Sequence, residues 1–262
     1  MIKEERRNEM KRTKVSLGVR VVALFFMTAF AISMGPGLFG EIAMAKKFTT
    51  DFRLEDCVFS EGGENPYFNL NPGSYWVLVG EEDGEEIRVE ITVLDATEVI
   101  DLQDEGIGLV VTRVVEEREW VDDELAEVSR NFFARCQETN AVYYFGEDVD
   151  IYEDGQIVSH EGAWRAGEDG AMPGLIMPGT FLLGARYYQE RAPGVAMDRA
   201  KNKRMGVEKE TPAGEFSGCV KVVETDRLEP DDKDIKVYCP GVGLVRDEEL
   251  LLVEFLWIED GG

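Results

Sequence analysis

Apolar and polar residues alternate along most of the chain beyond residue 73. In Ile87–Asp95 every second position is apolar, and the positions between carry charged or hydroxyl side chains. This period of two places one face of a β-strand in a core and the other in water. The dipeptide Asp83-Gly84 is a hairpin signal. The pattern therefore predicts strands over 74–80 and 87–95, joined as a hairpin.

Similar stretches continue to the end of the chain, and no stretch shows a convincing 3.6-residue period. Further strands are predicted over 107–120, 124–136, 141–152, 156–164, 180–190, 215–225, 234–245 and 249–259. Residues 46–73 are irregular, and 192–214, which are basic and bounded by Gly and Pro, are interpreted as a crossover or short helix. We predict a mainly β fold with little helix, an antiparallel meander of about ten strands curled into a barrel or half-barrel, because closure removes unpaired edges. It forms one domain over 74–262.

The first 45 residues have the pattern of a secretory signal peptide. Lysine and arginine are frequent up to Arg20, Val21–Ile32 is apolar apart from Thr28, and Ala43-Met44-Ala45 is a small-x-small cleavage pattern. The apolar run is shorter than the roughly 20 residues that cross a bilayer. We therefore predict cleavage after Ala45 and no stable membrane span in the mature chain.

The charge of the chain excludes some partners. It has 53 acidic and 28 basic side chains, for a net charge of −25, and the N-terminal segment is basic, so the remainder is more acidic still. Phosphate groups repel such a surface, which argues against binding nucleic acid or anionic membranes. The hydrophobic content of 44% is sufficient for a folded core.

Four cysteines follow the predicted cleavage site. An even number of cysteines in an oxidising compartment indicates disulfides. Cys219 and Cys239 are equidistant from Glu229, near the centre of the turn between two predicted strands, so they should face each other. By elimination Cys57 pairs with Cys136, which would tie the irregular segment to the sheet. The alternative is that one or more cysteines stay free.

The acidic stretch Tyr144–Trp164 surrounds His160, the single histidine of the chain. Alternation and the Asp154-Gly155 dipeptide predict a hairpin with an acidic, wet face. The spacing departs from that of an EF-hand loop. A weak calcium site remains an alternative, with the candidate ligands Glu147, Asp148, Asp150 and Asp154. No other cofactor is indicated.

Catalytic motifs are missing from the sequence. A strand would place Ser159 and Glu161 on the face opposite His160, and the chain contains no Gly-x-Ser-x-Gly. Two carboxylates are enough for glycoside hydrolysis, but 53 acidic residues single out no pair. We predict that the protein is not an enzyme, with a hydrolase that uses an unidentified carboxylate pair as the alternative.

Gly170–Phe181 contains two Met-Pro-Gly repeats. Such an apolar loop would cap the end of a barrel or line the mouth of a hydrophobic cavity, since methionine adapts to varied ligands. The candidate ligand-binding residues are Met172, Leu175, Ile176 and Met177.

Three motifs carry a resemblance. They are NPYFNLNPGSYW at Asn65–Trp76, FGEDV at Phe145–Val149, and PAGEF with YCPGVGLV between Pro212 and Val245. On these the chain resembles a group of uncharacterised secreted bacterial proteins. Its last hairpin is also similar to one in half-barrel envelope proteins related to the periplasmic lipoprotein carriers. That resemblance implies a curved antiparallel sheet that holds an apolar ligand on its concave face.

Together these observations predict an exported, non-enzymatic protein of the periplasm or the extracellular space. It would bind an envelope protein or a small molecule. The most specific form of this prediction is an apolar molecule inside a half-barrel. The alternatives are the hydrolase and an acidic protein that binds divalent cations.

Overall fold

The computed structural model of the chain describes residues 47–228 and 233–259, and the fold below belongs to the unit that begins at Phe48. The predicted signal peptide, residues 1–45, lies outside the described residues. No helix in the described part of the chain is both long and apolar enough to cross a bilayer.

Strands dominate the fold, as the alternation predicts. The N-terminal elements are short: η1 (Leu54–Asp56), β1 (Phe59–Ser60), β2 (Glu64–Asn65) and β3 (Phe68–Asn69). The others are β4 (Tyr75–Glu82), β5 (Glu85–Leu102), β6 (Gly108–Val121), β7 (Glu124–Cys136), β8 (Val142–Glu153), β9 (Gln156–Ser159), β10 (Trp164–Arg165), β11 (Met172–Met177), β12 (Arg186–Tyr188), β13 (Glu190–Arg191), β14 (Asp198–Thr211), β15 (Gly214–Asp226), β16 (Asp234–Cys239), β17 (Gly243–Asp247) and β18 (Leu250–Leu256).

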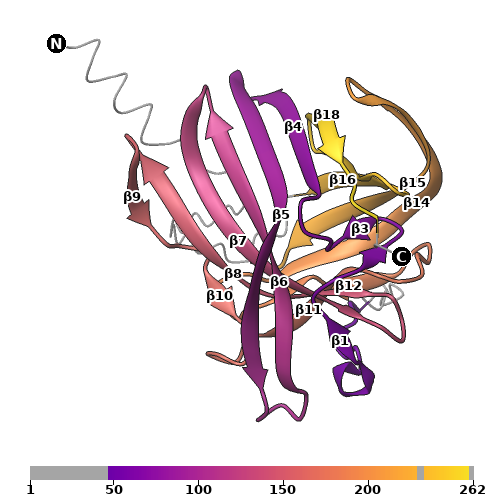
Figure 1. Cartoon of the computed structure of the whole chain (residues 1–262). Coiled ribbons are helices and arrows are strands. Elements are labelled where there is room, and N and C mark those ends of the chain that lie inside the picture. Colours follow the sequence, from indigo (N-terminus) through magenta and orange to yellow (C-terminus); the bar gives the residue numbers. More distant parts are fainter. Residues whose placement is uncertain (1–46, 229–232, 260–262) are drawn as a thin grey trace, which may run out of the picture. The chain divides into compact units, whose positions relative to one another are not determined.

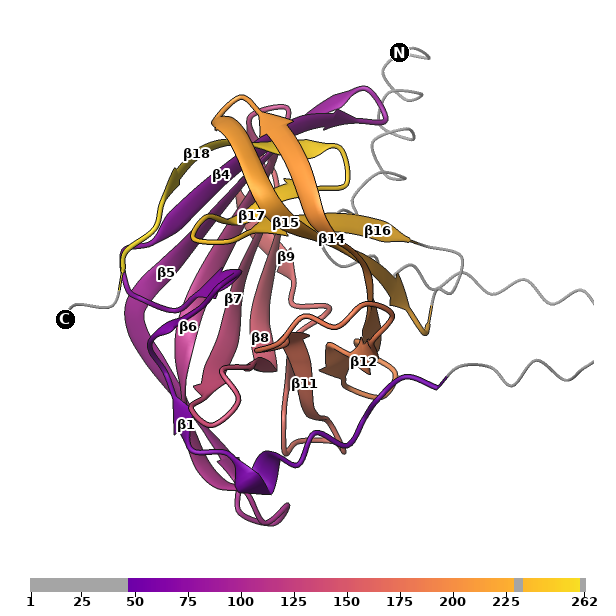
Figure 2. The ribbon, with the colours of Figure 1, turned by 90° about the vertical axis from the view of Figure 1, so that its right-hand side faces the viewer.

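One antiparallel sheet of 16 strands is nearly closed into a barrel. Its order is β12-β14-β15-β16-β17-β18-β4-β5-β6-β7-β8-β11-β13, with β1 paired to β7 and with β9 and β10 paired to β8. Figure 1 shows β4 to β8 side by side as one wall. Figure 2 shows β14 and β15 in front of β5 to β8. The predicted barrel is confirmed, whereas the expected count of about ten strands was too low because very short strands were not recognised.

The two ends of the sheet meet at a seam, which we define as residues 186–198. β12 pairs with β14 at one end, β13 pairs with β11 at the other, and Gln189 connects β12 to β13 in the chain. The backbone N–H of Gln189 donates to the carbonyl of Asp198 at 2.8 Å. The chain itself therefore bridges the gap between the two edges.

Two sequence predictions were wrong. Residues 192–214 form no crossover or short helix, since they contain the long strand β14, which pairs with β15. Ala200 and Asn202 of β14 are buried, while the basic Lys203 and Arg204 are exposed, so charge on the outer face concealed the alternation. The predicted strand over 180–190 is reduced to β12 and the first residue of β13.

Both predicted disulfides are confirmed. Cys219 and Cys239 lie next to the paired residues Val220 and Tyr238 on β15 and β16, so hairpin register brings them together. Cys57 bonds Cys136 at the end of β7 and joins the N-terminal segment to the sheet.

The two disulfides are expected to differ in their effect on stability. Cys57–Cys136 spans 79 residues and Cys219–Cys239 spans 20. In the chain-entropy model, replacing each pair by alanine lowers the free energy of unfolding by about 4.5 and about 3 kcal/mol respectively. Urea unfolding of the two double variants measures this difference. A larger loss from the shorter loop would contradict the expectation.

Candidate functional site

The hairpin around His160 forms as predicted. β8 and β9 pair antiparallel, and Asp154 and Gly155 have positive φ angles of 50° and 72°, as a type I′ turn requires. Nδ1 of His160 lies 2.9 Å from Oδ1 of Asp150, and the histidine side chain is 68% exposed. The contact with Asp150 ties His160 to β8 at the surface. The partners described for this histidine include no hydroxyl nucleophile.

The predicted calcium ligands do not converge on one point. Alternation directs Glu147 inward with Val149, while Asp148 lies on the other face and Asp154 sits in the turn. Among the described residues, the one group of three or more His, Cys, Asp or Glu with ligand atoms within 4.8 Å of one another is Cys57, Cys136 and Glu138, whose cysteines are disulfide-bonded. The four candidates therefore form no ready-made metal site.

The candidate apolar ligand residues belong to a strand. Met172, Leu175, Ile176 and Met177 lie in β11, which pairs with β8 and β13, so the expected apolar loop is wrong over these residues. Met177 is fully buried in the core and the other three are half-buried. Their contact with a ligand remains a prediction.

Carboxylates gather on the inward face of the barrel. Glu119 of β6 lies opposite Glu127 of β7, and Glu147 of β8 lies opposite a buried asparagine of β7. Their charges act between strands: Glu127 and Asp247 act on Glu119, and Glu127, Glu117 and Asp198 act on Glu147, so these groups form one network. The interior carboxylates, as we call them, are Glu117, Glu119, Glu127, Glu147, Glu190, Asp198, Glu224 and Asp247.

Burial and mutual repulsion raise the pKa values of these groups. Burial, with added repulsion from Glu127 and Glu117, raises the pKa of Glu119 to about 9. Burial raises the pKa of Glu147 to about 8, although the neighbouring Tyr144 hydroxyl opposes the shift. Burial raises the pKa of Glu127 and of Asp198 to about 7. Near neutral pH the native barrel therefore holds protons that an unfolded chain would release.

Lys236 is the counter-charge inside this network. Its Nζ lies 3.4 Å from Glu224 and 3.2 Å from Asp247. Burial lowers the pKa of Lys236, but the attraction of Asp247 and Glu224 outweighs it and keeps the pKa well above its ordinary value. Its charge also lowers the pKa values of Glu117, Asp198 and Glu224. The Gln189 side chain also donates to Glu224 at 2.7 Å, which links the network to the seam.

A bulge in β8 directs Glu147 and Tyr144 to the same face. Both pair with β7 residues that are two positions apart, and the register shifts between them. Gly146 in the bulge has a φ of 134°, and a Cβ there would collide with the backbone oxygen of Trp164. Glycine thus lets β10 approach β8, and Trp164 comes to lie opposite Glu147.

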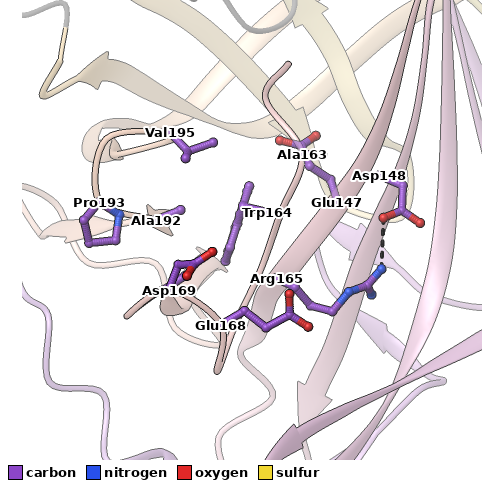
Figure 3. Close-up of a pocket in the computed structure, with 11 residues that line it drawn as sticks. Glu147, Asp148, Ala163, Trp164, Arg165, Glu168, Asp169, Ala192, Pro193 and Val195 are labelled. Atoms are coloured by element: carbon purple, nitrogen blue, oxygen red, sulfur yellow. Dashed lines mark hydrogen bonds and ion pairs between the residues drawn. The ribbon is translucent and has the colours of Figure 1, made fainter. Parts of the chain in front are cut away.

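A pocket of about 320 Å³ lies at the seam, lined by Glu147 and Trp164 (Figure 3). This volume is at the lower end of the range for small-molecule sites. One wall is apolar and comes from the seam, and the other carries charged side chains of β8, β10 and the turn at 166–171. The remaining lining residues are Asp148, Ala163, Arg165, Glu168, Asp169, Ala171, Ala192, Pro193 and Val195.

Three residues that line this pocket, Glu147, Trp164 and Arg165, each have a buried polar atom without a hydrogen bond in the protein; in Arg165 it is Nη1. Glu147 is 3% exposed and its Oε1 accepts no hydrogen bond, while Trp164 is 7% exposed and its indole N–H donates none. The Tyr144 hydroxyl lies near Glu147 and donates to Asn131. Buried polar atoms are nearly always paired, so these unpaired atoms on residues of one cavity make the pocket the candidate site.

Sequence reasoning named Glu147 as a candidate calcium ligand and did not name Trp164. The available signal was alternation, which places Glu147 on the face of Val149, away from Asp148 and Asp150. The contact with Trp164 has no local signal because it depends on the bulge and on the pairing of β10.

Comparisons of the chain with protein families, with curated proteins and with solved structures found no match.

Stability is expected to fall as pH rises, because of the interior carboxylates. The native state keeps the Glu119 proton up to a pKa of about 9, compared with an ordinary value of 4.5. The unfolded chain therefore binds fewer protons between these values, and the free energy of unfolding decreases as pH rises through that window. Replacing Glu119 by Gln should stabilise the protein by at least about 1 kcal/mol at pH 8 and much less at pH 5. Chemical denaturation at both pH values measures this.

The matched control is Glu81→Gln on the exposed part of β4. It should change stability by less than about 0.5 kcal/mol at either pH. An equal effect of Glu119→Gln at both pH values would contradict the assignment of a buried, protonated Glu119.

Replacing Lys236 by Met should be destabilising. It leaves Glu224 and Asp247 without their counter-charge, and because the Lys236 and Asp247 side chains are 27% and 30% exposed, water screens part of the loss and the expected cost is about 1 to 3 kcal/mol. Lys203→Met on the exposed face of β14 is the control and should have little effect. Urea unfolding at pH 7 compares the two variants, and equal stabilities would show that the Lys236 ion pairs are not structurally important.

Proposed function

We propose that this chain is an exported, non-enzymatic binding protein that holds a small ligand in the seam pocket. Glu147 and Trp164 line one cavity, and each has a buried atom without a partner in the protein, Oε1 of Glu147 and Nε1 of Trp164. Leaving each atom unpaired costs about 1 to 3 kcal/mol, and a ligand with complementary groups would recover this energy.

Export is supported by the cysteines and by the sequence of the leader. Both disulfides form between cysteines that follow the predicted cleavage site, and such bonds persist in oxidising compartments. The basic segment, the apolar run and the Ala43-Met44-Ala45 pattern have the order of a signal peptide. We propose the periplasm or the extracellular space as the location, in keeping with the resemblance to secreted and envelope proteins.

The side chains around the pocket favour a polar ligand over the apolar one expected from the sequence. An apolar molecule beside Glu147 would leave its Oε1 unsatisfied and would remove Asp148 and Arg165 from water. The apolar seam residues Ala192 and Val195 still suit a ligand with a small hydrophobic part.

A binding role is favoured over hydrolysis by how the pocket carboxylates are held. Two catalytic carboxylates must converge on one bond from within a cleft. Glu147 and Asp148 lie on opposite faces of β8, and Asp148 is held by Arg165 at 2.9 Å. The interior pair Glu190 and Asp198 share a hydrogen bond but do not line the described pocket.

Native mass spectrometry of the protein, purified after export by its own cell, tests the proposal. We expect a small-molecule adduct on the wild type that gentle organic extraction removes. Val195→Trp fills the pocket and should abolish the adduct, whereas Val158→Trp on exposed β9 should retain it. A wild type without an adduct, or an adduct that survives in Val195→Trp, would contradict a ligand in this pocket.

A further inference from the structure

We infer that the seam pocket selects a small organic cation, with an ammonium group at Glu147 and an apolar body against Trp164 and the seam residues Ala192 and Val195. This inference rests on the proposed function, because it specifies the ligand of the same pocket.

The charge of the pocket favours a cation. Four carboxylates line it, from Glu147, Asp148, Glu168 and Asp169, and Arg165 is the basic side chain that lines it with them. Nη2 of that guanidinium donates to Asp148 at 2.9 Å, and its Nη1 lies 3.5 Å from Glu98 as an ion pair without a hydrogen bond. An anion would therefore meet more negative than positive charge, while a cation would be attracted.

Carboxylates in the barrel interior add to the negative charge near Glu147. The carboxyl groups of Glu117, Glu127 and Asp198 act on Glu147 from β6, β7 and β14, and the network has Lys236 as its counter-charge, held between Glu224 and Asp247. A bound ammonium group would take the place of the proton that burial and this repulsion keep on Glu147. The acidic cluster alone would not define a site, but the free Oε1 of Glu147 shows where the missing donor belongs.

The ligand must also supply an acceptor and a hydrophobic part. The indole N–H of Trp164 is buried without an acceptor, so a ligand oxygen within reach of it would complete the pair. The Trp164 ring, packed edge-on against Tyr144 at 5.3 Å, gives the pocket an aromatic wall, which attracts cations. An amine that carries a hydroxyl or carbonyl oxygen on a compact apolar body meets these requirements.

A bare metal ion fits the pocket less well. A divalent cation such as calcium needs several oxygen ligands at about 2.3 to 2.6 Å from one point. In the described part of the chain no group of three or more carboxylates has ligand oxygens within 4.8 Å of one another. The cavity is also far larger than an ion and is partly apolar.

The test compares amines with analogues of the same shape that lack the amine. The probes are phenylalaninol against hydrocinnamyl alcohol, and leucinol against isohexyl alcohol, added to extracted protein at about pH 8. Titration calorimetry and tryptophan fluorescence should show binding of both amino alcohols, with the neutral alcohols at least about tenfold weaker. Trp164→Phe should remove the fluorescence change.

The decisive variant is Glu147→Gln, which keeps the shape of the side chain and removes its charge. It should weaken amino-alcohol binding at least about tenfold. The matched control is Glu168→Gln, an exposed acid of the same pocket, which should change the affinity less than about threefold. Circular dichroism and thermal melts of both variants establish that they are folded.

The outcomes separate this inference from the proposed function. Neutral alcohols that bind as tightly as the amines, or a Glu147→Gln variant that binds like the wild type, would overturn the cation and leave a ligand pocket in place. The same holds if the exported protein carries an extractable ligand but binds neither amino alcohol. Absence of both an adduct and probe binding would overturn the inference and the proposed function together.

Discussion

Repulsion among carboxylates inside the barrel is the constraint on which the rest of this structure depends. Glu117, Glu119 and Glu127 face the interior from one wall, and Glu224 and Asp247 face it from the other. Ionising them together in a poorly solvated interior would be prohibitive. The barrel tolerates them because raised pKa values keep part of the cluster protonated and because Lys236 neutralises its centre.

The seam connects barrel closure with the interior carboxylates and with the pocket. Barrel closure depends on a short connection in which Gln189 passes from the β14 edge to the β11 edge and also donates to Glu224. The same connection supplies Ala192 and Val195 to the pocket, so closure and the candidate site use one segment.

The sequence was informative where the deciding interactions were local. The alternation in Ile87–Asp95 and the Asp83-Gly84 turn predict the hairpin of β4 and β5 from neighbouring residues. Hairpin register is equally local, and it places Cys219 opposite Cys239. The strand prediction failed over 192–214 because lysine and arginine on the outer face of β14 outweighed the small buried residues Ala200 and Asn202. Composition measures the whole segment, whereas burial selects one face.

The sequence by itself determined that the chain is acidic, β-rich and stapled by two disulfides, and that its leader resembles a signal peptide. Those properties follow from composition and from interactions between near neighbours. Tertiary structure alone decided which carboxylates face one another, that Gly146 and its bulge bring Trp164 opposite Glu147, and that the seam closes over both. These depend on the register of strands far apart in the chain. Because a shift of one residue moves every side chain to the opposite face, no pattern along a single strand contains that information.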